Sequence, residues 1–243
     1  MNTLATLEQM KKMKLNGMLE SYRLQLELSL HQQLDAHELI GHLVQAELLS
    51  RINERTANYL KSAKLRVPAI PEHVECSKER NLSKEQLILL LEGKYLQRGE
   101  NILITGSTGC GKSFLACALG HQACMQGTKT LYLNMNRFIE RIAMSKVDGS
   151  YIKLLNQLER IPLIILDDFA LQPLSQDVKL AFLQILEDRY AKKSTIIVSQ
   201  RPVSKWHEYL NDPTIADAIL DRLTAKDHRI ELTGESRRKR KNP

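Results

Sequence analysis

Residues 106–113 read Gly-Ser-Thr-Gly-Cys-Gly-Lys-Ser, and this stretch says more about the fold than any other part of the chain. It follows a short apolar run at 101–105 and precedes an apolar-periodic run at 114–125, so it is predicted to join a strand to a helix. Glycines at these positions let backbone N–H groups curl around a polyphosphate, and the helix N-terminus adds a positive dipole. The pattern predicts a phosphate-binding loop made by Gly106, Ser107, Thr108, Gly109, Cys110, Gly111, Lys112, Ser113 and Phe114.

Two side chains at the end of this loop have specific expected roles. Lys112 is expected to reach the β- and γ-phosphates of a nucleotide, and the Ser113 hydroxyl is expected to hold Mg²⁺. Glycines alone would leave an ordinary glycine-rich turn as the alternative. A Gly-Lys-Ser sequence between a strand and a helix favours nucleotide binding instead.

A second motif places two acids directly after an apolar strand. Residues 163–166 read Leu-Ile-Ile-Leu, and Asp167 and Asp168 follow. Ligands bind at the carboxyl edge of parallel sheets, so Asp167 is predicted to hold Mg²⁺ and Asp168 to polarise the attacking water. The alternative is an acidic turn after a buried strand, which the upstream phosphate loop disfavours.

Two further polar positions are candidates for the same site. The strand 194–199 ends in Ser199-Gln200-Arg201-Pro202, where Gln200, with Ser199 as second choice, is predicted to contact the γ-phosphate. Arg222 lies near the end of a predicted helix, and an arginine supplied across a subunit interface can stabilise charge on the γ-phosphate. A strand-end turn and a surface arginine paired with Asp221 or Asp217 are the alternatives.

Hydrophobic periodicity indicates a helical first part of the chain. Apolar residues recur at helical spacing over 3–30 and over 35–63, where Asp35 is predicted to cap the second helix, so a helical hairpin or small bundle is expected. We interpret it as a surface for self-association or for a partner, with a bundle that only packs its own core as the alternative. Pro68 and Pro71 then indicate a linker.

From residue 76 strands alternate with helices, which predicts a parallel sheet with helices on both faces. Ser83 is expected to cap a short helix that ends at Glu92. The predicted strands are 101–105, 129–134, 162–167, 194–199 and 228–232, and the predicted helices are 112–126, 136–145, 149–159, 175–191, 203–209 and 214–224. The fold class is therefore α/β, with a five-stranded parallel sheet and a small all-α N-terminal domain. Its parts are 1–65 (helical), 66–75 (linker), 76–232 (α/β) and 233–243 (basic tail).

The charge of the chain is positive and unevenly placed. The net charge is +7 over 243 residues, yet residues 1–75 hold nine basic and nine acidic side chains, whereas residues 233–243 hold five basic and one acidic. A nucleic-acid partner is one interpretation of this tail, and a solvated tail without a partner is the other. The four cysteines form no CxxC pair, which argues against a zinc site. No apolar run approaches the roughly 20 residues of a membrane span, so a soluble cytoplasmic protein without a membrane partner is expected.

The glycine loop, the acid pair, the polar strand end and the helix arginine occur in an order that resembles the AAA+ ATPase family over 76–232. Residues 198–202, Val-Ser-Gln-Arg-Pro, are similar to the family's sensor-1 strand end, and Arg222 falls at its arginine finger. Many relatives have Glu where Asp168 stands, so the resemblance implies slow hydrolysis or a partner that closes the site. The family's helical lid is missing or vestigial, which leaves Arg237 or Arg238 as the local substitute for its sensor-2 arginine.

A closer resemblance rests on Lys14-Leu15-Asn16-Gly17-Met18, the proline-broken linker and Gly234-Glu235-Ser236-Arg237. These are similar to the IstB family of transposition helper ATPases, which is related to the helicase loader DnaC and the initiator DnaA. The resemblance implies a homo-oligomer with ATP and Mg²⁺ between subunits that assembles on double-stranded DNA. It further implies recruitment of the transposase of the same insertion sequence, and hydrolysis of ATP to ADP and phosphate that is slow without DNA or transposase.

Relatives in this clade carry an extra helix after the second strand, near the DNA path. Here that region has four basic residues opposed by Glu140 and Asp148. The predicted DNA-binding residues are therefore Arg137, Arg141, Lys146 and Lys153, with Arg237, Arg238 and Lys239 of the tail. A solvated helix face is the alternative. Asn81 and Leu82, just before the first helix of the ATPase domain, are candidates for the adenine pocket.

Two other functions remain open from the sequence, and a third is disfavoured. A replicative helicase loader would use the same ATPase with a different client. A nucleotide-gated DNA clamp would bind ATP with little hydrolysis, which the Asp167-Asp168 pair permits. A metabolic P-loop kinase would need an arginine-rich lid before the last strand, and the sequence offers none.

Overall fold

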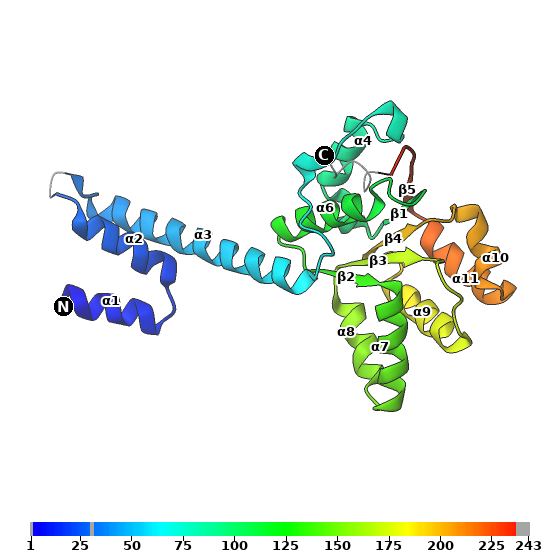
Figure 1. Ribbon diagram of the computed structural model, residues 1–243. Helices are drawn as coiled ribbons and strands as arrows, with labels where there is room; N and C mark the ends of the chain where they lie inside the picture. Colours follow the sequence, from blue (N-terminus) through cyan, green and yellow to red (C-terminus); the bar gives the residue numbers. More distant parts are fainter. Residues whose placement is uncertain (1, 30–31, 237–243) are drawn as a thin grey trace. The chain divides into compact units, whose positions relative to one another are not determined.

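The computed structural model describes residues 2–29 and 32–236 of the chain (Figure 1). The chain forms two compact units, one up to Asn58 and one from Tyr59 onward, so the division falls inside helix α3 (Ala36–Ala63). The sequence predicts the first domain boundary at residue 65, a few residues further along. Among the described residues, no helix is both long enough and apolar enough to span a membrane.

The first unit contains α1 (Thr3–Lys12), α2 (Asn16–Glu27) and most of α3. The continuous helical pattern expected over 3–30 is wrong in one respect, because the chain turns at Lys14, whose φ is 58°. Helix α3 begins after Asp35 as predicted, since Oδ1 of Asp35 accepts the N–H groups of His37 and Glu38 at 2.8 Å each. A helical periodicity in the sequence therefore does not reveal a one-residue reversal within it.

The turn at Lys14 brings the start of α2 against α3. A Cβ atom on Gly17 would lie 2.4 Å from the carbonyl oxygen of Ala46, so only glycine permits this approach. Oε2 of Glu47 accepts the N–H groups of Gly17 at 2.9 Å and of Met18 at 3.2 Å, which supplies the N-terminal cap that α2 lacks locally. The residues 14–18 are thus explained by the packing of α2 on α3.

The second unit is built on a five-stranded parallel sheet, which confirms the predicted fold class. The strand order is β2-β3-β4-β1-β5. All pairs are parallel, and Ile104 is opposite both Val198 of β4 and Ile230 of β5. The strands are β1 (Asn101–Gly106), β2 (Thr130–Asn134), β3 (Leu163–Phe169), β4 (Ser194–Ser199) and β5 (Asp227–Leu232).

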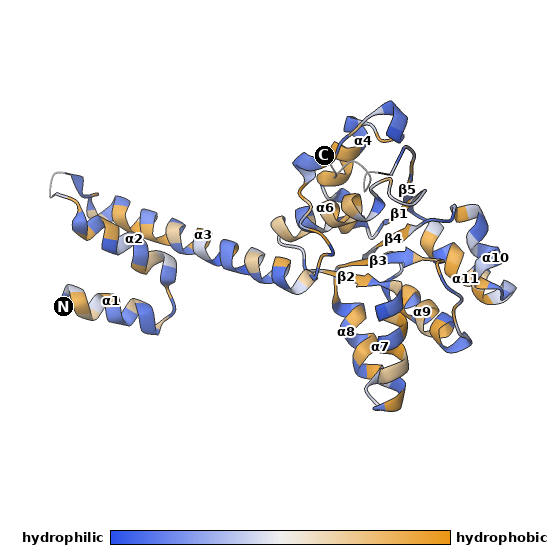
Figure 2. Cartoon of the chain, in the orientation of Figure 1, coloured by the Kyte–Doolittle hydropathy of each residue, from blue (hydrophilic) through white to orange (hydrophobic). Residues whose placement is uncertain are grey.

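Helices cover both faces of this sheet (Figure 1). Alternate side chains of each strand enter two separate cores, so that Ile102 and Ile104 face one and Leu103 faces the other. The first face carries α4 (Lys84–Leu91), α5 (Lys94–Arg98) and α6 (Lys112–Met125), and the second carries α7 (Met135–Val147), α8 (Tyr151–Arg160), α9 (Gln176–Arg189), α10 (Trp206–Leu210) and α11 (Pro213–Thr224). Figure 2 shows hydrophobic residues gathered in the strands, as expected for a sheet buried on both faces.

The segment 66–75, predicted as a linker, is a packed part of the second unit instead. Ala69 is fully buried, Pro71 begins a short 3₁₀ helix (Pro71–His73) and is buried, and Val74 belongs to the core beneath α6. The prolines do end the long helix, as expected. The apolar residues between them nevertheless cover α6, because a chain without helical structure can still bury side chains.

Candidate functional site

The glycine loop connects β1 to α6, as the sequence predicts. Gly106, Gly109 and Gly111 have φ values of 139°, 86° and 95°, which side chains other than glycine rarely adopt. A Cβ on Gly106 would lie 2.1 Å from the carbonyl oxygen of Leu232, so the end of β5 closes directly on the loop. The backbone N–H groups at the start of α6 are thereby held at the carboxyl edge of the sheet.

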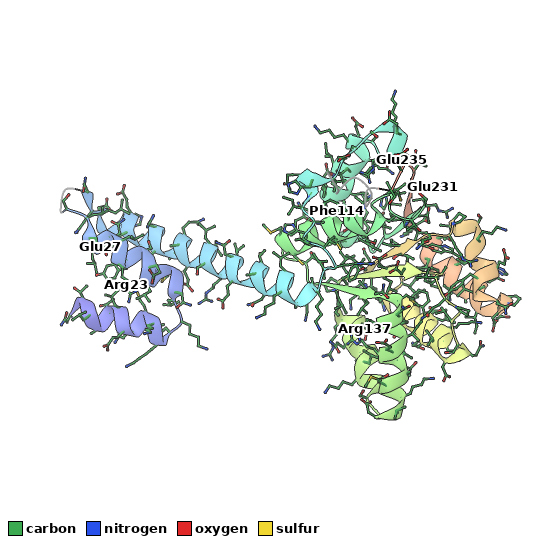
Figure 3. The ribbon with its side chains drawn as sticks, in the orientation of Figure 1. Arg23, Glu27, Phe114, Arg137, Glu231 and Glu235 are labelled. Atoms are coloured by element: carbon green, nitrogen blue, oxygen red, sulfur yellow. The ribbon has the colours of Figure 1, made fainter. Side chains whose placement is uncertain are left out.

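Lys112 points into the concave side of this loop. Its side chain is buried, and Nζ donates to the carbonyl oxygens of Gly106 at 2.8 Å and Ser107 at 2.7 Å. A pocket of about 440 Å³ opens here, a volume typical of small-molecule sites. Its lining residues are Arg66, Val67, His73, Arg80, Thr108, Gly109, Gly111, Lys112, Ser113, Phe114, Asp168 and Gln200. Phe114, one of these lining residues, is labelled on α6 in Figure 3.

The acid pair lies on an irregularity of β3. The register between β3 and β4 shifts between Leu166 and Phe169, and Asp168 has a φ of 61°. A bulge of this kind re-aims side chains, and a non-glycine residue held at positive φ carries strain that is typical of functional sites. The strand therefore continues past its predicted end at residue 167, and Asp168 turns into the pocket.

Both carboxylates of this pair are held by neutral donors from β2. The hydroxyl of Tyr132 donates to Oδ2 of the buried Asp167 at 2.5 Å, and Nδ2 of Asn134 donates to Oδ2 of Asp168 at 2.5 Å. The N–H of Asp168 donates to Oδ1 of Asp167 at 2.8 Å. The pKa of Tyr132 is raised, mainly by burial and secondly by the adjacent Asp167 carboxylate. The hydroxyl therefore stays protonated and remains a donor.

Arg66 is the residue of this site that sequence reasoning missed. Its Nη1 atom lies 3.2 Å from Oδ2 of Asp168 and 3.5 Å from Oδ2 of Asp167. The pKa of Arg66 is raised, first by a hydrogen bond with Tyr132, so the guanidinium is a permanent cation here. Its position after a predicted helix and before Pro68 carries no signal of this contact, since the partners are 102 positions apart.

The donor set around the acid pair fits Mg²⁺. The Ser113 hydroxyl and the Asp168 carboxylate line one pocket, and Asp167 adjoins Asp168. No cluster of three or more His, Cys, Asp or Glu suited to a metal exists within residues 2–29 and 32–236. Mg²⁺ commonly binds through one or two carboxylates together with phosphate oxygens, and it keeps several waters.

Gln200 lies at the same pocket, as its position after β4 predicts. Its Oε1 atom accepts a hydrogen bond from the hydroxyl of Thr108 at 2.8 Å. Ser199, the second candidate, is buried, and its hydroxyl donates to the carbonyl oxygen of Phe169 at 2.8 Å. The structure thus directs Gln200 toward the loop and uses Ser199 to hold the bulged strand.

Arg222 lies on α11, and the described residues that line the pocket do not include it. Its guanidinium forms an ion pair with Glu187 of α9, and Nη1 lies 3.4 Å from Asp221. The side chain is about one-quarter exposed, at 27%. The guanidinium is therefore partly accessible to solvent and is paired with carboxylates of its own chain.

Asn81 and Leu82, the two residues expected at an adenine pocket, are not among the residues that line this pocket. Leu82 is buried in the core, and Nδ2 of Asn81 donates to the carbonyl oxygen of Glu231 at 3.0 Å. Asn81 ends the 3₁₀ helix Lys78–Arg80 in a left-handed conformation, which turns its side chain toward β5. The apolar wall of the pocket is instead supplied by Val67 and Phe114.

The predicted DNA-binding residues divide into two groups. Arg137 and Arg141 of α7 line a groove of about 610 Å³ beside the edge strand β2, and Lys64 and Lys129, which the sequence did not indicate, line it too. Glu140 also lines this groove and pairs with Arg137 at 3.1 Å. Figure 3 labels Arg137 on α7, on the opposite side of the sheet from Phe114.

The remaining basic candidates lie away from this groove. Lys146 pairs with Asp177 of α9 at 2.8 Å and lies over the ring of Tyr151. Lys153 is exposed on α8. The tail residues Arg237, Arg238 and Lys239 lie outside the described residues.

Comparison with known proteins agrees with this geometry. Residues 8–243 match the family model described as IstB-like ATP binding protein. A Sinorhizobium fredii protein named as an insertion sequence ATP-binding protein, y4pL, is 42% identical over 234 residues, covering 96% of each chain. A replication initiator DnaA bound to AMPPCP and single-stranded DNA has a similar fold, with a TM-score of 0.59 and 21% identity. The similarity covers 71% of this chain and 52% of the DnaA chain. The DnaC helicase loader gives a TM-score of 0.56 at 18% identity, covering 72% of this chain and 99% of that one.

Proposed function

Because the chain belongs to the IstB-like ATP-binding protein family of insertion sequences, we propose that it is an ATPase that assembles on duplex DNA and recruits a transposase. The observation that carries the ATPase part is the convergence of Lys112, Asp168 and Gln200 on one pocket. These residues come from three different strand ends and bring together a phosphate-binding cation, a carboxylate and an amide. Such a set is what phosphoryl transfer to water requires.

Each side chain has a distinct role in this proposal. Lys112 binds the β- and γ-phosphates, and Ser113 and Asp167 would hold Mg²⁺, which would supply charge neutralisation at the transferred phosphoryl group. Asp168 accepts a hydrogen bond from the attacking water and orients it. Gln200 contacts the γ-phosphate from the adjacent strand, and Arg222 of a neighbouring subunit stabilises the charge that develops there.

Slow basal hydrolysis follows from the contacts of Asp168. Its Oδ2 atom already accepts a hydrogen bond from Asn134 and lies 3.2 Å from Arg66. Two donors already occupy this oxygen, so it is less available to accept a hydrogen bond from the attacking water. We propose that assembly on DNA, or contact with the transposase, releases this carboxylate and so starts hydrolysis.

The DNA-binding part of the proposal is supported by the groove beside β2. Four cations and one carboxylate line it, and Arg137 and Arg141 lie four apart on one face of α7. A groove of this charge suits the phosphate backbone of DNA and does not require contacts to bases. We therefore propose DNA binding with steep salt dependence and little sequence preference.

The first unit is proposed as a surface for a second copy of the chain. Ile40, Val44 and Leu48 of α3 recur every four residues and are 63%, 53% and 52% exposed. Exposed apolar stripes of this kind usually mark association sites. The pair Val44→Asp and Leu48→Asp is expected to weaken oligomers while leaving nucleotide binding intact, and oligomers of unchanged mass would remove this surface from the proposal.

The test of the proposed function is protein mass in solution with a duplex of about 50 base pairs, long enough for several subunits to reach its phosphates. Wild type and Lys112→Ala are compared with and without ATP and Mg²⁺. A large complex that needs both DNA and ATP, and is lost in Lys112→Ala, supports a nucleotide-dependent assembly. A protein that stays monomeric on DNA under every condition overturns it. Capture of the transposase rather than a replicative helicase by the assembled complex then identifies the client.

A further inference from the structure

The guanidinium of Arg66 lies beside the acid pair, where a bound Mg²⁺ would also place its positive charge. It lies within 3.5 Å of Oδ2 of Asp167 and within 3.2 Å of Oδ2 of Asp168, and it lines the same pocket as Lys112 and Ser113. We propose that Arg66 is a positioning residue that competes with Mg²⁺ for these carboxylate oxygens and thereby sets the Mg²⁺ concentration at which ATP binds. The inference rests on the proposed function in one point, namely that Asp167 holds Mg²⁺.

Arg66 is the charged side chain that forms salt bridges with both carboxylates of the acid pair. Tyr132 and Asn134 are neutral donors, and the third donor is the backbone N–H of Asp168. Neutral donors can stay in place when a cation arrives, since they only orient the carboxylates. A guanidinium and a divalent cation on the same oxygens repel each other, so Arg66 is the group that has to move.

The side chain of Arg66 is also the one that is able to move. It is 43% exposed, whereas Asp167 is 1% exposed and is held by two hydrogen bonds. Arg66 follows the last residue of α3, Ala63, after a left-handed turn at Lys64, and its own backbone is outside any helix or strand. Departure of the guanidinium into solvent breaks its contacts with Tyr132, Asp167 and Asp168 but requires no backbone change in the sheet or in α6.

The size of the effect follows from the exposure of this ion pair. Pairs that are partly exposed contribute modestly, so removing Arg66 is expected to lower the Mg²⁺ midpoint roughly fivefold. Arg66→Gln removes the charge and keeps a side chain of similar length. Arg66→Lys keeps the charge as a shorter and more strongly hydrated group, so its midpoint is expected between those of Arg66→Gln and wild type.

The experiment is a Mg²⁺ titration of the binding of a fluorescent ATP analogue to the full chain. Arg66→Gln is expected to reach half-saturation at about one-fifth of the wild-type Mg²⁺ concentration. Arg98→Gln is the matched control, because Arg98 is an exposed arginine of the same unit paired with Glu100 at 3.8 Å, and its midpoint should equal that of wild type. In an Asp168→Asn background, Arg66→Gln should produce a smaller shift, since one of its two partners is gone.

A second measurement uses the metal alone. Binding of Mn²⁺ without nucleotide, followed by electron paramagnetic resonance, should be tighter for Arg66→Gln and for Arg66→Lys than for wild type. Equal or weaker metal binding in both variants, or an unchanged or raised Mg²⁺ midpoint, overturns the competition. Failure of wild type to bind the nucleotide at saturating Mg²⁺ would count against the proposed function instead, while the Mn²⁺ comparison would still decide the role of Arg66.

Discussion

The hydroxyl of Thr108 donates a hydrogen bond to Oε1 of Gln200 at 2.8 Å, although 92 positions separate the two residues. They meet because β1 and β4 are neighbours in the sheet, with Ile104 opposite Val198, so their carboxyl ends open at the same edge. This polar contact therefore connects the phosphate loop to the end of β4 at the pocket. We propose that Gln200 also contacts the γ-phosphate, and a side chain with both contacts can report whether that phosphate is present.

The first prediction concerns Gln200. Gln200→Ala is expected to lower turnover about 100-fold, because an amide aimed at developing charge acts mainly in the transition state, while ATP binding weakens less than about threefold. Thr108→Val is the matched control, since it removes the other half of the hydrogen bond and keeps the amide. Steady-state turnover and nucleotide affinity are measured for both variants, and wild-type turnover in Gln200→Ala would remove the residue from the site.

The second prediction concerns Arg222 and its resting partner Glu187. Arg222→Ala and Asp168→Asn are each expected to be inactive with DNA present, and both keep Lys112, on which the proposed assembly depends. An equal mixture should regain about one quarter of wild-type turnover, because random assembly pairs an intact Asp168 with an intact neighbouring Arg222 at that frequency. A mixture as inactive as its components would place Arg222 outside the neighbour's site. Glu187→Gln, which frees the arginine without deleting it, should keep its activity.

The third prediction concerns the conformation of the phosphate loop. Gly109 has a φ of 86°, and a Cβ there would lie 2.2 Å from Oγ of Ser236, whereas Gly149 has a φ of 75° with nothing within 4 Å. Gly149→Ala should therefore lower the unfolding free energy by only about 1 kcal/mol, which is the strain of alanine in a left-handed backbone conformation. Gly109→Ala adds a clash at the pocket and should also abolish nucleotide binding. Thermal unfolding and nucleotide titration of both variants measure these two effects. Equal effects in the two variants would contradict the clash between a side chain at 109 and Ser236.

The fourth prediction concerns pH and the packing of α2 on α3. The pKa of Glu47 is lowered below its ordinary 4.5. The largest cause is the hydrogen bond from Arg51, and hydrogen bonds from the N–H groups of Met18 and Gly17 lower it further. A carboxyl whose pKa is lower in the folded state stabilises it fully above the unfolded pKa, and the contribution is lost as pH falls through the folded value. The start of α2 should therefore open below pH 4.5.

Glu47→Gln separates this effect from other titrations. Hydrogen exchange of peptides from α2 should be faster in the variant than in wild type at pH 7, by a difference of roughly 1 kcal/mol in local opening. The difference should vanish at pH values below the folded pKa, where the wild-type carboxyl is itself protonated. A difference that is independent of pH would show that packing, and not charge, governs this contact.

The fifth prediction concerns the basic groove. Replacing Arg137 and Arg141 by Ala together should weaken duplex binding at every sequence and reduce the slope of log affinity against log salt by about 2. Lys146→Ala with Lys153→Ala is the matched pair, because Lys146 pairs with Asp177 and neither lysine lines the groove. Binding is measured across a series of salt concentrations. A larger change of slope in the lysine pair would move the DNA path away from β2.

Much of the fold and part of the site are readable from local patterns. The five strands occur at the predicted positions within two residues, and Oγ of Ser83 caps α4 by accepting the N–H of Gln86. Apolar runs, caps and glycine loops are properties of neighbouring residues, so periodicity and spacing suffice to find them. The break at Lys14 and the packing of 66–75 escaped this reasoning because both depend on what the segment meets in space.

The sequence by itself determined the phosphate loop, the acid pair at the end of a buried strand and the alternation that requires a parallel sheet. These depend on contacts between residues near one another in the chain. Only the tertiary structure decided the strand order and the bulge that turns Asp168 into the pocket. It also decided that Arg66 contacts the acid pair and that Lys64 and Lys129 line the groove. Arg66 and Asp168 are 102 positions apart, and no periodicity encodes a meeting over that distance. The contact between Arg66 and Asp168 forms only when the complete sheet has assembled and the end of α3 lies beside β2 and β3. Long-range contacts of this kind are fixed by strand register and packing together.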